Sequence, residues 1–115
     1  MDMLTYAIII FAIAAVGGVV LALKVFAGQL ASWPLSIVHA LLGATGLVIL
    51  IMMVLEGTEG GAITAALGLL LVAALGGFYL VSFHVMQVVA PKNIAIIHAG
   101  VAVVGFLTSL SVLLG

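Results

Sequence analysis

Three histidines are the residues of this chain with the most specific chemistry. His39 and His98 are 59 positions apart, and they lie in long apolar runs, as does His84. A neutral imidazole ligates metals, and its charge changes near neutral pH. The chain has no cysteine, which removes disulfides, iron–sulfur clusters, thiolate zinc sites and covalently attached c-type haem from consideration. The histidines are therefore the starting point for a functional hypothesis.

Composition determines which solvent the protein occupies. Hydrophobic residues make up 68% of the chain and charged residues only 4%. Such a composition is typical of an integral membrane protein and excludes a water-soluble globule. About 20 apolar residues span a bilayer as a helix, and the chain contains four such runs, at about 4–27, 35–55, 62–88 and 93–114. Short links between the runs predict an all-α membrane protein, a four-transmembrane-helix up-down bundle that forms one domain over residues 1–115.

An internal similarity relates the two halves of the chain. A shift of 59 residues superposes about 4–56 on about 63–115. The identical pairs include His39 with His98, and the others that we single out begin at Ala14, Ala15, Gly17, Gly18, Ile37, Ala40 and Gly46. We therefore expect a tandem two-helix repeat. Each copy crosses the membrane an even number of times, so both have the same orientation and their pseudo-two-fold axis runs along the membrane normal.

Charged residues predict the orientation in the membrane. Lys24 and Lys92 lie near the links within the two copies, whereas Asp2, Glu56 and Glu59 lie at the other side. The positive-inside rule then places both termini outside, in a prokaryotic inner (plasma) membrane. The formal net charge of −1, without a basic face, gives no sign of nucleic-acid binding.

Small residues accompany the histidines at helical spacing. Gly43 and Gly46 follow His39 at spacings of four and three, which places them on one helix face. Gly105 stands at the equivalent place after His98. Small residues allow close approach of helices in lipid, and they also leave room for a flat cofactor. We therefore expect these faces to point into the bundle.

The prolines suggest a depth for each histidine. His39 follows Pro34 by five residues, His98 follows Pro91 by seven, and His84 precedes Pro91 by seven. At about 1.5 Å per residue the three imidazoles are expected at one level, roughly 8–10 Å along their helices. Such a cluster also fits a three-histidine zinc or copper site or a proton relay, which are alternatives.

Two imidazoles from diagonal helices suit the axial positions of a haem. The second and fourth helices of an up-down bundle lie diagonally across its core, so a two-fold axis through the iron relates His39 to His98. The lysines would meet the propionates, since long side chains reach the interface. We predict one non-covalent haem b. The candidate cofactor-binding residues are His39, His98, His84, Gly43, Gly46, Gly105, Lys24 and Lys92, of which His39 and His98 are the candidate metal ligands.

This arrangement resembles the four-helix core of membrane b-type cytochromes, such as the cytochrome b of quinol-oxidising complexes. In that family, histidines on the second and fourth helices hold haem, and only His39 and His98 correspond to them. The family has two histidines on each ligand helix and stacks two haems, whereas this chain has one on each. The resemblance therefore implies at most one haem. No motif of that family's quinone site is present, so quinone binding is unsupported.

The sequence thus predicts an electron-transfer subunit that contacts lipid and the spans of other subunits in a larger, respiratory-type membrane complex. The main alternative is an accessory subunit without chemistry of its own, because the short links leave little surface outside the membrane. No nucleophile with an adjacent base, phosphate loop or paired carboxylate appears. We therefore do not predict an enzyme activity for this chain alone.

Overall fold

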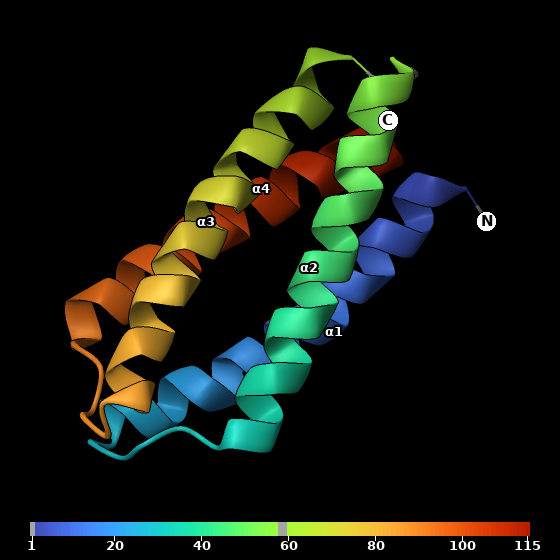
Figure 1. Cartoon of the computed structure of the whole chain (residues 1–115). Coiled ribbons are helices and arrows are strands. Elements are labelled where there is room, and N and C mark those ends of the chain that lie inside the picture. The colour runs from blue at the N-terminus through green and yellow to red at the C-terminus, as the bar shows by residue number, and fades with distance from the viewer. Residues whose placement is uncertain (1, 58–59) are drawn as a thin grey trace.

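The computed structural model describes residues 2–57 and 60–115 and is entirely helical apart from its links (Figure 1). Its four helices are α1 (Met3–Phe26), α2 (Trp33–Glu56), α3 (Gly61–Val85) and α4 (Lys92–Leu114). The prediction of an all-α four-helix bundle is confirmed, and most helix boundaries differ from the expected ones by one or two residues.

Local side-chain chemistry sets several helix ends. The Asp2 carboxylate accepts hydrogen bonds from the Thr5 backbone N–H and hydroxyl, which caps α1. Ser32 caps α2, and Gly57 ends it in the left-handed region at φ 67°. The expected span to residue 88 was too long, because α3 ends at Val85 and Gln87 adopts a φ of 58°. The apolar residues that follow belong to the link.

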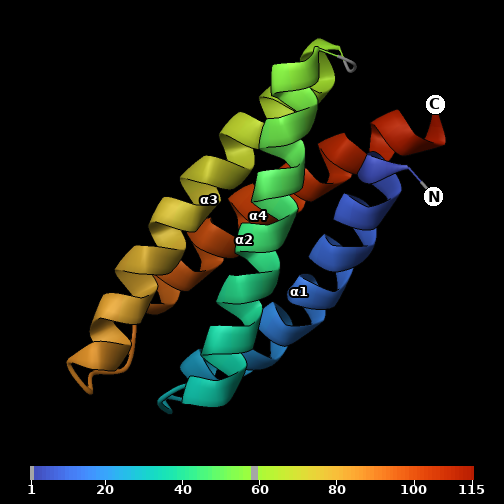
Figure 2. The ribbon, with the colours of Figure 1, turned by 45° about the vertical axis from the view of Figure 1, so that its right-hand side comes forward.

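Two helical hairpins form the bundle. α1 packs along α2 and α3 along α4, and the hairpins meet through α1 with α4 and α2 with α3. α2 and α4 therefore lie diagonally across the bundle, as expected. Both views show the two termini at one end, with the α1–α2 and α3–α4 links at the other (Figures 1 and 2). We call these the terminal end and the link end.

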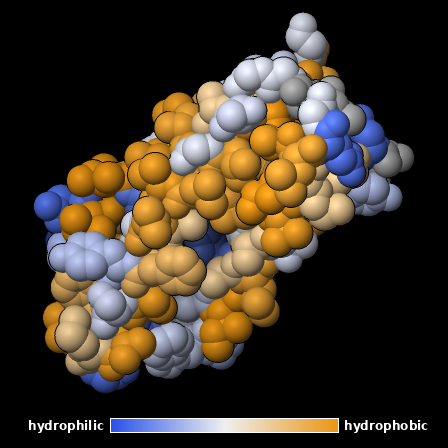
Figure 3. Space-filling view, turned by 45° about the horizontal axis from the view of Figure 1, so that its top comes forward, coloured by the Kyte–Doolittle hydropathy of each residue, from blue (hydrophilic) through white to orange (hydrophobic). Residues whose placement is uncertain are grey.

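The helix surfaces suit a lipid environment. All four helices are long and apolar enough to cross a membrane, and the molecule extends 43 × 22 × 22 Å. Large apolar side chains such as Leu55, Leu75 and Phe78 are exposed. The face in Figure 3 is mostly apolar, and its most hydrophilic residues lie at the two ends and at the base of one central hollow. These properties are compatible with an integral membrane protein.

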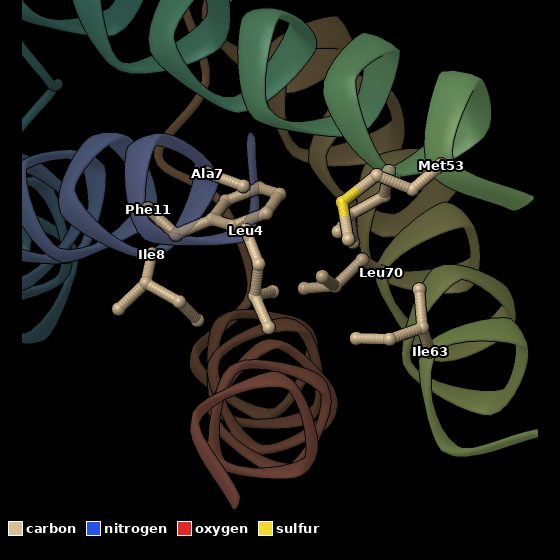
Figure 4. Close-up of a cluster of buried hydrophobic side chains, with 8 residues drawn as sticks. Leu4, Ala7, Ile8, Phe11, Met53, Ile63 and Leu70 are labelled. Carbon is tan, nitrogen blue, oxygen red and sulfur yellow. The ribbon is translucent and has the colours of Figure 1, made fainter. Parts of the chain in front are cut away.

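The apolar core occupies only the terminal end. Its members are Leu4, Ala7, Ile8, Phe11, Leu50, Met53, Ile63 and Leu70 (Figure 4). Beyond Ala14 and Ala73 toward the link end, the buried side chains of the described residues are His84 and Ala95. No large aliphatic side chain is buried there, so the two ends of the bundle are packed by different kinds of residue.

Charges are also divided between the ends. Lys24 lies in the last turn of α1 and Lys92 begins α4, so both cations are at the link end. Asp2 and Glu56 are at the terminal end. Glu59, which we expected beside them, lies outside the described residues. The cations and the described acids are thus separated along the bundle axis.

Candidate functional site

Each of the two paired histidines bonds to a carbonyl of the neighbouring helix in its own hairpin. His39 Nδ1 lies 2.8 Å from the Ala14 carbonyl oxygen, and His98 Nδ1 lies 2.7 Å from that of Ala73. A carbonyl only accepts hydrogen bonds, so Nδ1 carries the proton and donates it. In the neutral ring, Nε2 then keeps a free lone pair. Metal-ligating histidines commonly have this arrangement.

The two imidazoles meet across the centre of the bundle. The ring centroids of His39 and His98 are 6.3 Å apart, and the ring planes cross at 78°. Both side chains are half-buried. A metal about 2 Å from each of two opposed Nε2 atoms holds the ring centroids roughly 6 Å apart. The spacing of these rings therefore fits two ligands on opposite sides of one metal ion.

Glycines of the neighbouring helix lie directly against the rings. A Cβ atom added at Gly18 would lie 2.9 Å from His39 Cε1, and one at Gly77 would lie 3.3 Å from His98 Cε1. The preceding glycines are less restricted, since a Cβ at Gly17 would meet nothing closer than 3.6 Å. These glycines thus allow the two helices of each hairpin to approach closely beside the histidine.

The other site glycines have different surroundings. A Cβ at Gly43, one turn beyond His39, would meet nothing within 4 Å. One at Gly46 would lie 2.5 Å from the Phe11 ring, and one at Gly105 would lie 2.8 Å from Leu70 Cγ. The space over Gly46 and Gly105 is therefore filled by apolar side chains, and Gly43 is the open member of the set.

His84 does not join the other imidazoles. Its ring stacks on Trp33, with centroids 3.9 Å apart and planes inclined by 11°. Trp33 begins α2, about 9 Å below His39 at the usual helical rise. The expectation that all three histidines share one level is therefore wrong. It counted helical rise to Pro91, whereas α3 ends at Val85.

The histidine site is accordingly a pair. Within residues 2–57 and 60–115, no three His, Cys, Asp or Glu side chains come close enough to hold a metal ion together. The three-histidine zinc or copper alternative is not formed. Lys24 and Lys92 are exposed at the link end, and neither lies between the rings.

Sequence reasoning missed three groups at these sites. The carbonyls of Ala14 and Ala73 orient the paired rings, and Trp33 covers His84. The alanines carried a usable signal, because each lies 25 residues before its histidine in the internal match. Trp33 had no such signal, since Lys92 stands at the position 59 residues later.

Two apolar grooves flank the site on the outside of the hairpins. One, of about 470 Å³, lies between α1 and α2 and reaches His39, and the other, of about 350 Å³, lies between α3 and α4 and reaches His98. Each of the nine lining residues of one groove is 59 positions from a lining residue of the other. Tyr79 takes the place of Val20 in the smaller groove. The hairpins thus surround their histidines with matching positions.

Comparisons of the chain with protein-family models, with curated proteins and with solved structures find no match.

Proposed function

We propose that this chain is a small integral-membrane b-type cytochrome subunit, which holds one haem b between His39 and His98 and transfers electrons within a larger membrane complex. The observation that carries the proposal is the pair of crossed imidazoles, 6.3 Å apart, each with its Nδ1 bonded to a carbonyl. Two neutral nitrogen ligands from diagonal helices are a donor set that suits haem iron.

The chain's own residues have separate tasks in this proposal. When bound, haem supplies a reversible one-electron couple at its iron. Ala14 and Ala73 hold the tautomer that leaves each Nε2 free, because their carbonyls accept the Nδ1 protons. The apolar outer faces keep water and polar oxidants away from the rings. Lys24 and Lys92 supply positive charge for the propionates at the link end.

The packing also favours a planar cofactor at this level. The aliphatic core ends on the terminal side of the histidines. Gly43 has open space beside His39. The space over Gly46 and Gly105 is filled by Phe11 and Leu70, so the open space lies nearer His39 and Gly43.

The proposal includes a tandem repeat and an orientation. The same carbonyl bond, glycine contact and groove recur 59 residues apart, which supports two copies of one hairpin related by a pseudo-two-fold axis. With Lys24 and Lys92 at one end, the positive-inside rule puts the link end in the cytoplasm and both termini outside. We assign the chain to a prokaryotic plasma membrane.

A proton path has less support than haem. Several intramembrane hydroxyls bond within their own helices, as Thr45 does to the Leu41 carbonyl and Thr108 to that of Val104. Ser109, the most buried of them, bonds to the Gly105 carbonyl. These hydroxyls do not form a chain between helices. The hydrogen bonds of these hydroxyls therefore supply no path to the imidazole pair.

The second candidate function is that of an accessory subunit without a cofactor. The specific observation in its favour is the exposure of large apolar side chains on every helix, together with short links. Such faces suit contact with the spans of other proteins. Both candidates therefore share the expectation of a larger assembly.

The visible spectrum of the purified protein decides between them. We expect the chain, extracted in detergent from haem-replete cells, to bind one non-covalent haem b and to show the sharp alpha band of six-coordinate, low-spin iron after reduction. A colourless preparation from cells in which a control cytochrome is fully loaded would overturn the haem proposal and favour the accessory subunit.

Native electrophoresis after extraction in mild detergent tests the assembly. We expect the chain at a mass several times its 11.6 kDa, together with other polypeptides. Recovery as a monomer with full haem content and normal stability would contradict a role inside a complex. This outcome would leave haem binding itself supported.

A further inference from the structure

We infer that Gly18 and Gly77 are positioning residues, which act as seats for the imidazoles of His39 and His98 and fix the crossed orientation of the two rings. The importance of this orientation for iron rests on the proposed function, whereas the seats themselves belong to the protein without haem. The inference assigns a role to two residues that the ligand set does not include.

Contact distances carry the first step. A Cβ at Gly18 would lie 2.9 Å from His39 Cε1, 3.5 Å from Nδ1 and 3.7 Å from Nε2. The ring edge thus rests against the bare backbone of α1. An imidazole is rigid, and its Nδ1 is held by the Ala14 carbonyl one turn earlier on the same helix. A methyl group at position 18 therefore has to displace the ring.

The second hairpin repeats the arrangement with a looser fit. A Cβ at Gly77 would lie 3.3 Å from His98 Cε1 and 3.8 Å from Nδ1, and Ala73 supplies the carbonyl one turn earlier. Carbonyl and glycine are four residues apart in both helices, so they lie on one helix face. Each ring has two fixed points, a hydrogen bond at Nδ1 and a steric stop at Cε1. Together with the histidine Cβ, which the backbone holds in place, these two points define the plane of the ring.

The planes matter because they determine the ligand field of a metal between the rings. The two imidazoles cross at 78°. In low-spin ferric haem, crossed ligand planes leave the iron d orbitals nearly degenerate and give one highly anisotropic low-field EPR signal. Parallel planes separate the orbitals and give a rhombic three-line spectrum. Rotation of one ring by a methyl group therefore has a spectroscopic signature that loss of stability alone does not produce.

The chain supplies a graded series of glycine-to-alanine variants. By contact distance, G18A should have the largest effect and G77A a smaller one, because the added Cβ atoms lie 2.9 Å and 3.3 Å from the rings. G17A is the matched control on the same helix, since its nearest atom is at 3.6 Å and belongs to Leu35. G68A is a second control in α3, with nothing within 4 Å.

NMR of haem-free protein in detergent, labelled with ¹³C at histidine Cε1, tests the seats directly. We expect the His39 Cε1–H signal to shift in G18A, the His98 signal to shift less in G77A, and neither to move in G17A or G68A. Unchanged signals in folded G18A would overturn the inference, whatever the chain binds. If G18A does not fold, the G77A variant, with its milder contact, decides the question.

EPR of haem-loaded protein tests the consequence. We expect the low-field signal to move to lower g in G18A, with an accompanying change in midpoint potential, while the haem content remains that of the G17A control. Haem binding with an identical signal in G18A and G17A would refute the seats but keep the proposed function. Absence of haem from the unsubstituted chain would refute the proposed function, and the NMR result would still decide on the seats.

Discussion

The two hairpins have the same residues around their histidines. In each, an alanine carbonyl binds Nδ1 and a glycine one turn later lies against Cε1, as with Ala14 and Gly18 for His39. The glycines next to the apolar core also correspond, because Phe11 lies against Gly46 in one hairpin as Leu70 lies against Gly105 in the other. Equivalence is therefore closest at the level where the two rings meet.

At the link end the hairpins differ. Trp33 of α2 stacks on His84 of α3, whereas the positions 59 residues away hold Lys92 and Val25. The bundle is thus joined by a ring stack on the α2–α3 side, and the α1–α4 side has no equivalent pair. The contrast teaches that the surroundings of the paired imidazoles match in the two hairpins, whereas the link-end contact between the hairpins is made by unmatched residues.

Substitution of the paired histidines has the largest expected effect. H39A and H98A should each abolish the low-spin alpha band, because each removes one of the two proposed axial ligands. H84A should leave the spectrum essentially unchanged, since its ring is stacked on Trp33. Reduced and oxidised spectra of the three variants provide the measurement. Loss of haem in H84A with retention in H39A would show that the hairpins are not equivalent at the cofactor.

Substitution of Gly46 and Gly105 should have the next largest effect, a loss of stability. In G46A the added Cβ would lie 2.5 Å from the Phe11 ring, which should destabilise the fold by about 1–3 kcal/mol. G105A should cost less, because Leu70 rotates away more easily than an aromatic ring. Unfolding by SDS in mixed micelles measures both. The F11L/G46A double variant gives the first hairpin the residue pair that G105A has in the second, so its stability should approach that of G105A, and a lack of recovery would argue against the overpacking explanation.

Removal of the ring stack should be milder. H84A removes a stacked pair between α2 and α3, and we expect a loss of about 0.5–1.5 kcal/mol beyond that of buried area. Trp33 is the only tryptophan, so its fluorescence reports on the same contact. The emission should change in H84A and remain as in the parent protein in a V25A control. Equal fluorescence in parent and H84A would mean that the rings are not stacked in solution.

Loss of the Asp2 cap of α1 at low pH should have the smallest effect on stability. Hydrogen bonds from the Thr5 backbone N–H, and then from its hydroxyl, hold the pKa of Asp2 below its usual 3.8. A carboxyl with a lowered pKa in the folded state stabilises the fold above the unfolded pKa and loses this contribution as pH falls through the folded value. The protection of the Thr5 amide, measured as its exchange rate relative to the intrinsic rate at each pH, should therefore fall below about pH 4. The start of α3 after Gly60, which lacks a side-chain cap, should show no such step.

Much of this fold is predictable from the sequence, because long apolar runs and the polar residues between them suffice to place four helices. The diagonal relation of α2 and α4 follows from short links alone. The level of His84 was not predictable by counting residues to Pro91, because the left-handed turn at Gln87 ends the helical rise and apolar residues continue past it. Only the backbone conformation reveals that end.

The candidate site was likewise predictable from the sequence only in part. Spacing predicted that His39 and His98 lie near each other, and their rings are 6.3 Å apart. Spacing also placed Gly46 on the bundle-facing side, and it is buried. Whether the space over it is open depends on Phe11, which comes from another helix 35 positions earlier. A pattern along one helix contains no information on which side chain of a neighbour fills a gap.

The restriction of aliphatic packing to the terminal end has a consequence for biogenesis. Leu4, Leu50, Ile63 and their neighbours can join the four helices immediately after insertion, before any prosthetic group arrives. The link end has no such aliphatic core, and the Trp33–His84 stack joins the hairpins there. If the chain binds haem as proposed, the cofactor can therefore enter away from this core, without disrupting it.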